Sequence, residues 1–296
     1  MKSLLACLSL FVGILMSSCT QYNFDDMDEG FEAEEGRVEV IFHITDIEQI
    51  PFENTYVSRA SQLSALCSRI TLAVFQGEEK IKNVSQLVGS DAFGTFTMEL
   101  KPGNYRLVVI AHNGTGNATI STPERITFPN NKCTDTFYNY QEFDVEQDAS
   151  VSVSLKRAVA AFRMSITDNM PLNVSKMQFY YTGGSSTFDA VSGYGCVNSK
   201  QTETFAIGEE MKGAPTQFQV YTFPHAQSGS LKMTVTAMDA SGTSICEKVY
   251  ENLPITVNKI SCWEGEFFQS ANTECSSAFT LDVDNGGEWG GTISVE

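Results

Sequence analysis

The chain has 296 residues and a formal net charge of −17, with 36 acidic residues against 19 lysines and arginines. Nucleic acids are bound by clustered lysine and arginine, so this charge balance excludes nucleic acid as a partner. Hydrophobic residues make up 42% of the chain and aromatic residues 11%, which is ample for packed cores. The length corresponds to roughly two domains.

The chain opens with a short apolar segment. Lys2 precedes the run Leu4–Met16, which is almost wholly apolar. This run is too short to span a bilayer, which takes about 20 apolar residues, so residues 1–18 are predicted to be a signal peptide. The small pair before Cys19 is similar to a bacterial lipobox, with Met16 where leucine is usual. We therefore predict that Cys19 is the lipid attachment site, acylated by chains such as palmitate; the alternative is an ordinary secretory signal.

Residues 19–36 carry seven acidic side chains and no basic one: Asp25, Asp26, Asp28, Glu29, Glu32, Glu34 and Glu35. Such a segment buries little and repels itself, so it is expected to be an extended, solvated tether. In lipoproteins of Bacteroidota, acidic residues just after the lipidated cysteine resemble a signal for export to the outer leaflet. The sequence thus predicts a protein anchored by lipid in the outer membrane and facing the cell surface.

The first strands follow the tether. Val38, Val40, Phe42 and Ile44 alternate with other residues, which predicts a half-buried strand, and Arg69–Phe75 is β-branched and aromatic in the same manner. Phe96–Leu100 leads into Lys101-Pro102-Gly103-Asn104, and Tyr105–Ala111 leaves it. Proline presets φ at the second turn position and glycine accepts a positive φ, so this segment is predicted to be a hairpin.

The second half reads in the same way, with strand patterns in KMQFYY, QFQVYTF, LKMTVTAM and NLPITV and a close in FTLDV and TISV. No window shows helical periodicity, so the prediction is an all-β protein. FHITD at Phe42–Asp46 is echoed by MSITD at Met164–Asp168. We expect two tandem β-sandwiches, residues 37–156 and 157–296, joined almost without a linker.

Six cysteines remain beyond Cys19: Cys67, Cys133, Cys196, Cys246, Cys262 and Cys275. An even number in an exported chain permits three disulfides, and the spacing is unlike that of zinc sites. Of the fifteen connectivities, Cys262 with Cys275 closes the smallest loop between sequence neighbours, a bond worth about 3 kcal/mol. This pair is the predicted disulfide.

The sequence offers no catalytic motif. His43 and His112 alternate with apolar residues, which predicts solvent-facing or half-buried positions; His225 is the third histidine. Asp282–Glu288 invites a calcium interpretation, but its glycine and acidic residues miss the EF-hand spacing, and a hairpin turn is the commoner use. Thr182–Ser186 is glycine-rich but no helix follows it, so it predicts a turn and not a phosphate site. We predict no enzyme activity, no metal and no cofactor.

Several segments resemble the fimbrillin-associated anchor and accessory lipoproteins of Bacteroidota, the FimB-type family. They are the lipobox at Cys19, Leu100–Asn113, Leu155–Ile166, Tyr180–Asp189 and the closing FTLDVDNGGEWGGTISV. The resemblance implies two transthyretin-like domains, fimbrial subunits as partners, and a role in attaching or terminating a fimbria.

The same family joins its subunits by strand donation, and in its stalk subunits a protease removes the first strand. Here neither arginine nor lysine follows Val38–Ile44 before Arg59, so the first strand is expected to stay. The closing strands Phe279–Val283 and Thr292–Val295 are the expected contact with the adjoining subunit.

A surface carbohydrate-binding lipoprotein of a glycan-capture system is the alternative. Tyr140, Tyr180, Tyr181 and Tyr194 could form a stacking platform for sugars. Trp263 and Trp289 lie in strand-like settings where core packing is the expected use.

Overall fold

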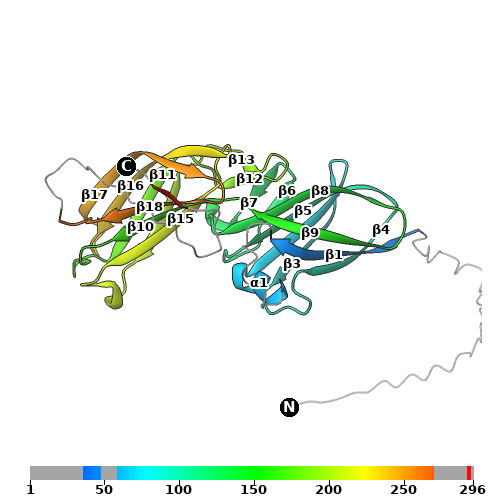
Figure 1. Ribbon diagram of the computed structural model, residues 1–296, viewed down its shortest axis with the longest axis horizontal. Helices are drawn as coiled ribbons and strands as arrows, with labels where there is room; N and C mark the ends of the chain where they lie inside the picture. The colour runs from blue at the N-terminus through cyan, green and yellow to red at the C-terminus, as the bar shows by residue number, and fades with distance from the viewer. Residues whose placement is uncertain (1–35, 48–58, 270–291, 295–296) are drawn as a thin grey trace, which may run out of the picture. The chain divides into compact units, whose positions relative to one another are not determined.

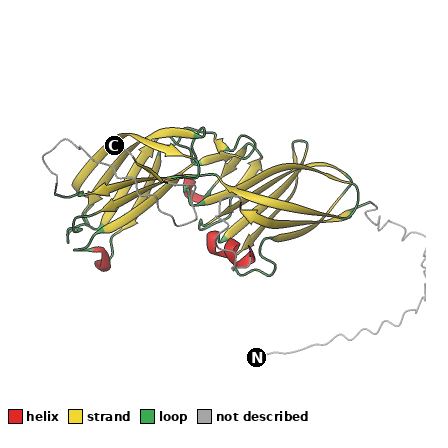
Figure 2. Ribbon diagram, viewed as in Figure 1, coloured by secondary structure: helices red, strands yellow, loops and turns green. Residues whose placement is uncertain are grey.

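The computed structural model describes residues 36–47, 59–269 and 292–294, and residues 37–296 form one compact unit by their contacts. The all-β prediction is confirmed, since strands dominate the ribbon and helices are few and short (Figure 2). The prediction missed α1 (Arg59–Leu66), which is too short for its periodicity to stand out. Leu63 and Leu66 on this helix pack into the first core, so tertiary contacts stabilise it.

The first half is a sandwich made from one sheet that folds over itself, in the order β3-β2-β5-β8-β9-β1-β4 (Figure 1). Strand β9 pairs with β8 only at its end, through Lys156 and Arg157, and with β1 along the rest of its length. This change of partner lets the two parts of the sheet face each other. The strands are β1 (Val38–Ile47), β2 (Arg69–Gln76), β3 (Glu79–Leu87), β4 (Thr95–Leu100), β5 (Gly103–His112), β8 (Thr136–Val145) and β9 (Ala149–Arg157).

The core between these two layers confirms the period-two pattern of the first strand. Val40 and Phe42 of β1 are fully buried, whereas Glu39, which directly precedes Val40, is exposed. They meet Leu72 and Val74 of β2 and Leu107 of β5 in one apolar cluster. Burial of these side chains contributes about 1.5 to 3 kcal/mol each, so this cluster is a main source of stability in the first half.

The predicted hairpin at Lys101–Asn104 is wrong. The chain does turn there, and Gly103 has φ of +154°, but β4 pairs with β1 while β5 pairs with β2 and β8. The turn therefore carries the chain from one layer of the sandwich to the other. Turn residues determine where the chain reverses but not which strands pair. Here β4 and β5 bury their apolar faces in the same core from opposite sides.

The second half is a sandwich of two four-stranded sheets, β15-β10-β18-β19 and β14-β11-β16-β17. Its core includes Phe162, Phe179, Phe218 and Trp263, so the expected use of Trp263 in packing is confirmed. The strands are β10 (Ala160–Ile166), β11 (Lys176–Thr182), β14 (Gln201–Ala206), β15 (Thr216–Thr222), β16 (Ser228–Met238), β17 (Ser244–Thr256), β18 (Ile260–Gly265) and β19 (Thr292–Ser294). Two short 3₁₀ turns, η2 (Pro129–Asn131) and η3 (Glu209–Met211), complete the described elements.

A small fourth sheet is shared by the two halves. Its order is β13-β12-β7-β6, with β6 (Thr119–Thr122) and β7 (Arg125–Thr127) from the first half and β12 (Thr187–Asp189) and β13 (Tyr194–Gly195) from the second (Figure 1). Phe188 of β12 lies opposite Ile126 of β7 in this sheet. This pairing could not be predicted from the sequence, since its strands are two to four residues long.

This shared sheet packs on the outer face of the first sandwich. Phe75 of β2 and Val108 and Ile110 of β5 join Phe188 and Phe223 in a third apolar cluster. Strand β2 is therefore buried on both faces and not half-buried as predicted. The proposed boundary between residues 156 and 157 falls at the last pair of β9, beside this cluster, and the division into two domains stays a prediction.

Candidate functional site

Several predicted site residues lie outside the described part of the chain. They are Cys19, Cys275, Trp289 and the turn Asp282–Glu288. Cys262 is half-buried on β18. Lipidation at Cys19 and the Cys262–Cys275 disulfide therefore stay predictions.

The histidines occupy three different environments. His43 is half-buried as predicted, with Nδ1 3.3 Å from Thr95 Oγ1. The prediction for His112 was wrong, because it is only 1% exposed at the end of β5. Its Nδ1 accepts a hydrogen bond from the Gly114 N–H at 2.9 Å, and burial, together with the nearby Arg69 charge, lowers its pKa to about 4. His225 Nδ1 lies 2.8 Å from the Gly195 carbonyl oxygen.

The tyrosine platform considered for the carbohydrate-binding alternative does not form. Tyr180 is 39% exposed, but Tyr181 is fully buried and donates its hydroxyl to the Tyr221 carbonyl at 2.9 Å. Neighbouring residues on a strand point to opposite faces, so these two rings cannot share a surface. Tyr140 and Tyr194 are half-buried on other strands. A stacking surface of four tyrosines is therefore excluded.

The first strand is an interior strand of its sheet. β1 pairs in parallel with β9 on one side and antiparallel with β4 on the other. Its register with β4 places Phe42 opposite Phe96, and both side chains are buried. Loss of β1 would leave two unpaired strand edges and an open apolar groove.

The last described strand lies at an edge. β19 (Thr292–Ser294) pairs in parallel with Ile260–Cys262 of β18 at one end of the sheet β15-β10-β18-β19. Only three residue pairs hold it there. A short edge strand is a weakly stabilised part of a sheet, and the outer N–H and C=O groups of β19 have no strand partner among the described residues.

A buried arginine fixes the contact between the halves. Arg157, 2% exposed, donates from Nε to Asp135 Oδ1 at 2.7 Å and from Nη2 to Asp135 Oδ2 at 3.0 Å. Its Nη1 donates to Asn258 Oδ1 at 2.9 Å, and its guanidinium lies over the Phe137 ring at 4.6 Å. Burial raises the pKa of Asp135, an effect that Arg157 opposes. The geometry is that of a bidentate charge-assisted pair, which holds its partners in one orientation.

A cleft of about 360 Å³ opens beside this arginine and is called the junction cleft below. Its walls come from β8 and β9 of the first half and from the β12–β13, β15–β16 and β17–β18 connections of the second. Its lining includes the side chains of Tyr138, Lys156, Tyr194, Gln227, Asn258 and Lys259. The described residues that line it include no aspartate or glutamate. The cleft could not be predicted from the sequence, because its two lysines, Lys156 and Lys259, stand far apart in the chain.

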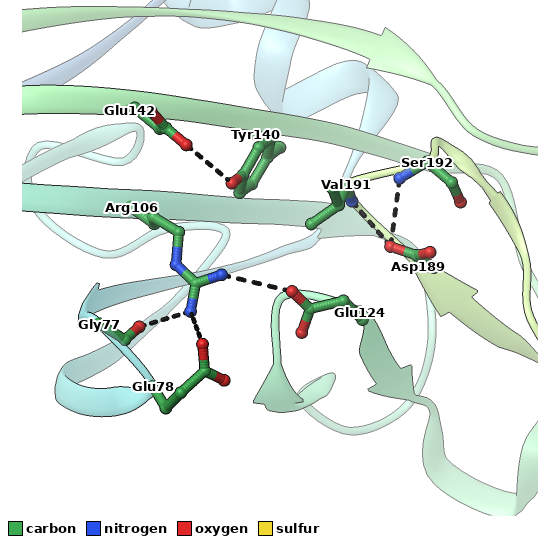
Figure 3. Close-up of polar contacts among 9 residues, drawn as sticks. All are labelled: Gly77, Glu78, Arg106, Glu124, Tyr140, Glu142, Asp189, Val191 and Ser192. Atoms are coloured by element: carbon green, nitrogen blue, oxygen red, sulfur yellow. Dashed lines mark hydrogen bonds and ion pairs between the residues drawn. The ribbon is translucent and has the colours of Figure 1, made fainter.

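The turn that closes one wall of the cleft is held rigidly (Figure 3). Asp189 Oδ1 accepts the N–H groups of Val191 at 2.8 Å and Ser192 at 3.2 Å. Gly193 follows with φ of +80°, and a Cβ there would stand 2.3 Å from the Tyr138 hydroxyl oxygen. Only glycine accepts both constraints without strain, so the turn and Tyr138 are fixed against each other.

The nearby Arg106 shows a different charge environment (Figure 3). Its Nη1 lies 3.3 Å from Glu124 Oε1 and its Nη2 3.3 Å from Glu78 Oε1, and it also donates to the Gly77 carbonyl. This guanidinium is neutralised by carboxylates and ties the β2–β3 turn to the β6–β7 turn. The lysines of the junction cleft have no such partner among the described residues.

Two further observations limit the chemistry of the described residues. No three histidine, cysteine, aspartate or glutamate side chains in residues 36–47, 59–269 and 292–294 stand together as a metal site. Within the same ranges, no helix has the length and apolar character to cross a bilayer.

Comparison with protein families decides the identity. The family model described as fimbrillin-A associated anchor proteins Mfa1 and Mfa2 matches residues 50–295. The chain belongs to this family. Membership agrees with the resemblance found in the sequence and supports a fimbrial accessory or adhesin role. A search of curated proteins finds no match.

Comparison with solved structures finds a similar fold in one protein and weaker similarity in others. A putative adhesin from Bacteroides ovatus is similar with a TM-score of 0.50 and 11% identity, over 81% of this chain and 88% of that one. The fimbrial anchor protein Mfa2 from Porphyromonas gingivalis gives a TM-score of 0.39 and 12% identity, over 72% of this chain and 82% of that one. Putative polysaccharide-binding proteins from Bacteroides thetaiotaomicron give 0.46 and 13%, over 74% and 81%.

Proposed function

We propose that this chain is a lipid-anchored accessory subunit that attaches or terminates a fimbria at the outer membrane. The observation that carries the proposal is the match of residues 50–295 to the family of fimbrillin-associated anchor proteins. The role is structural and not enzymatic: strands bind other subunits and the lipid holds the assembly to the cell.

The lipid end of the proposal rests on the first 36 residues. Cys19 follows an apolar segment of signal-peptide length, and an acidic tether separates it from the first strand. One acyl chain binds a membrane only marginally, whereas two or three hold firmly, since each buried CH₂ contributes about 0.8 kcal/mol. Acylation of Cys19 would therefore keep the subunit on the membrane under a pull on the fimbria.

The polymer end rests on the difference between β1 and β19. Phe42 of β1 is fully buried between paired neighbours, and β1 is followed by no arginine or lysine before Arg59. A retained β1 keeps the first sandwich closed, so that half would not accept a strand from another subunit. β19 lies at a sheet edge with three residue pairs, where main-chain hydrogen bonds to an adjoining subunit can form. A subunit whose first half accepts no strand, but whose second half can bind an adjoining subunit, would stand at the base or the end of a polymer.

Cys19→Ala tests the membrane end. Mass spectrometry of the wild-type N-terminal peptide should show acylated Cys19, and the variant should leave the membrane fraction for the soluble one. Cys196→Ala, which removes an exposed cysteine elsewhere, is the matched control and should stay on the membrane. An unmodified peptide containing Cys19, or a Cys19→Ala variant that stays membrane-bound, would overturn the lipid anchor.

A further inference from the structure

The junction cleft has a charge opposite to that of the molecule. The chain carries a net charge of −17, yet the cleft is lined by Lys156 and Lys259 and by no carboxylate among the described residues. Lys156 is exposed and lies 5.0 Å from the centre of the Tyr138 ring, and Lys259 is half-buried. Neither ammonium group has a carboxylate partner in the described part of the chain. Two lysine ammonium groups without carboxylate partners in one cleft attract an anion of matching size.

The remaining groups in the cleft are hydrogen-bonding side chains. The Oδ1 of Asn258 is taken by Arg157, which orients the amide so that its NH₂ is left available, and no described residue accepts from it. Gln227 is exposed, and the Tyr194 hydroxyl has no partner among the described residues. The half-buried Tyr194 ring adds an apolar surface. The lining is thus mostly polar, and its aromatic side chains are Tyr138 and Tyr194.

The geometry points to a carboxylated sugar as the ligand of the junction cleft. A uronic or sialic acid unit has a carboxylate for the lysines, hydroxyls for Asn258 and Gln227, and an apolar ring face for Tyr194. The volume of about 360 Å³ lies within the range of small-molecule sites. An inserted peptide strand or helix relies on apolar pockets for its side chains, which this polar lining does not supply.

The two sandwiches contribute jointly to this site. Lys156 comes from β9, and Tyr194, Gln227, Asn258 and Lys259 come from the second half. Arg157 and the shared sheet hold these walls together, so the site is preformed and binding requires little ordering. The inference does not rest on the fimbrial role; either can fail without the other.

The test uses the full chain in detergent and isothermal titration with a trigalacturonide, a glucuronate disaccharide and sialyllactose. Neutral trigalactoside and a glutamate-rich hexapeptide are the comparison ligands. We expect saturable binding of at least one acidic sugar, at least about tenfold weaker binding of the neutral one, and weakening as salt rises. Hydrogen exchange should show protection at residues 192–195 and 257–259.

Variants separate the charge effect from damage to the fold. Lys156→Met and Lys259→Met should each weaken binding about fivefold, since each removes one charge contact. Lys101→Met, which removes an exposed lysine at the β4–β5 turn, is the control and should bind as wild type. The site is refuted if no acidic sugar binds below about 10 mM, if trigalactoside binds equally well, or if the lysine variants are unchanged. Tighter binding of the hexapeptide would assign the cleft to a peptide and also overturn the proposal.

Discussion

Phe188→Ala tests whether the shared sheet couples the two halves. Phe188 belongs to the second half by sequence, is 0% exposed, and packs against Tyr138 of β8 at 4.7 Å and against Phe223 at 5.0 Å between ring centres. Truncating a buried phenylalanine to alanine costs about 3 to 5 kcal/mol. Each lost aromatic pair is worth about 0.5 to 1.5 kcal/mol beyond buried area, which favours the upper part of that range. This loss is comparable with half the stability of a typical domain.

Urea denaturation combined with hydrogen exchange measures the effect and where it is felt. We expect a loss of about 4 kcal/mol, with faster exchange in β5 of the first half and in β11 and β16 of the second. Val191→Ala, at a 46% exposed position in the β12–β13 connection that follows, should change stability by less than about 0.5 kcal/mol. Loss of protection in only one half would show that the sandwiches unfold independently, and the coupling argument would be wrong.

Three other changes probe the cores and the charges. Leu107→Asp should unfold the first sandwich, seen as loss of its exchange protection, because a lone carboxylate in the core costs several kcal/mol; a folded variant with wild-type protection would contradict this. Burial lowers the pKa of His112 from 6.5 to about 4, so the unfolded chain binds the extra proton first and stability falls as pH drops from 6.5 to 4, by about 3 kcal/mol. His112→Gln should reduce the pH dependence of the free energy of unfolding between pH 6.5 and 4, whereas His43→Gln should not. Equal pH dependence in wild type and both variants would refute the assignment of this effect to His112. Arg157→Met should cost about 3 to 5 kcal/mol by leaving Asp135 buried without its partner, whereas Arg157→Met with Asp135→Leu should recover much of the loss in urea melts; no recovery would contradict the role of the pair.

The strand pattern of the sequence predicted much of the fold because side chains alternate faces with period two. Val40 and Phe42 alternate with more exposed neighbours, and the structure buries them as expected. The same rule was wrong for β2, whose run Ile70–Phe75 is buried throughout. A continuous apolar run indicates burial on both faces but does not say what covers the second face. Here the cover comes from strands of two to four residues, too short to carry a pattern.

The pairing of strands and the junction cleft lay beyond sequence reasoning for a related reason. The turn at Pro102-Gly103 was recognised correctly, but its strands pair elsewhere because partner choice depends on the whole core. Lys156 and Lys259 come from opposite halves and meet only through the fold. Alternation predicted a solvent-facing or half-buried His112, but it is buried, and Phe128 packs against its ring with centres 5.3 Å apart. Contacts distant in sequence decided each of these cases.

Retention of fimbriae on the cell tests the central claim most directly. Cells carrying the chain without residues 277–296, which removes β19, are compared with wild type and with the Lys101→Met variant by measuring the major fimbrial subunit in the cell and medium fractions. We expect the shortened chain to stay in the membrane while filaments appear in the medium, and we expect wild-type and Lys101→Met cells to keep their filaments bound. If cells that lack residues 277–296, or the whole gene, still hold filaments of normal length, the anchor proposal is contradicted. That result would favour the carbohydrate-binding alternative.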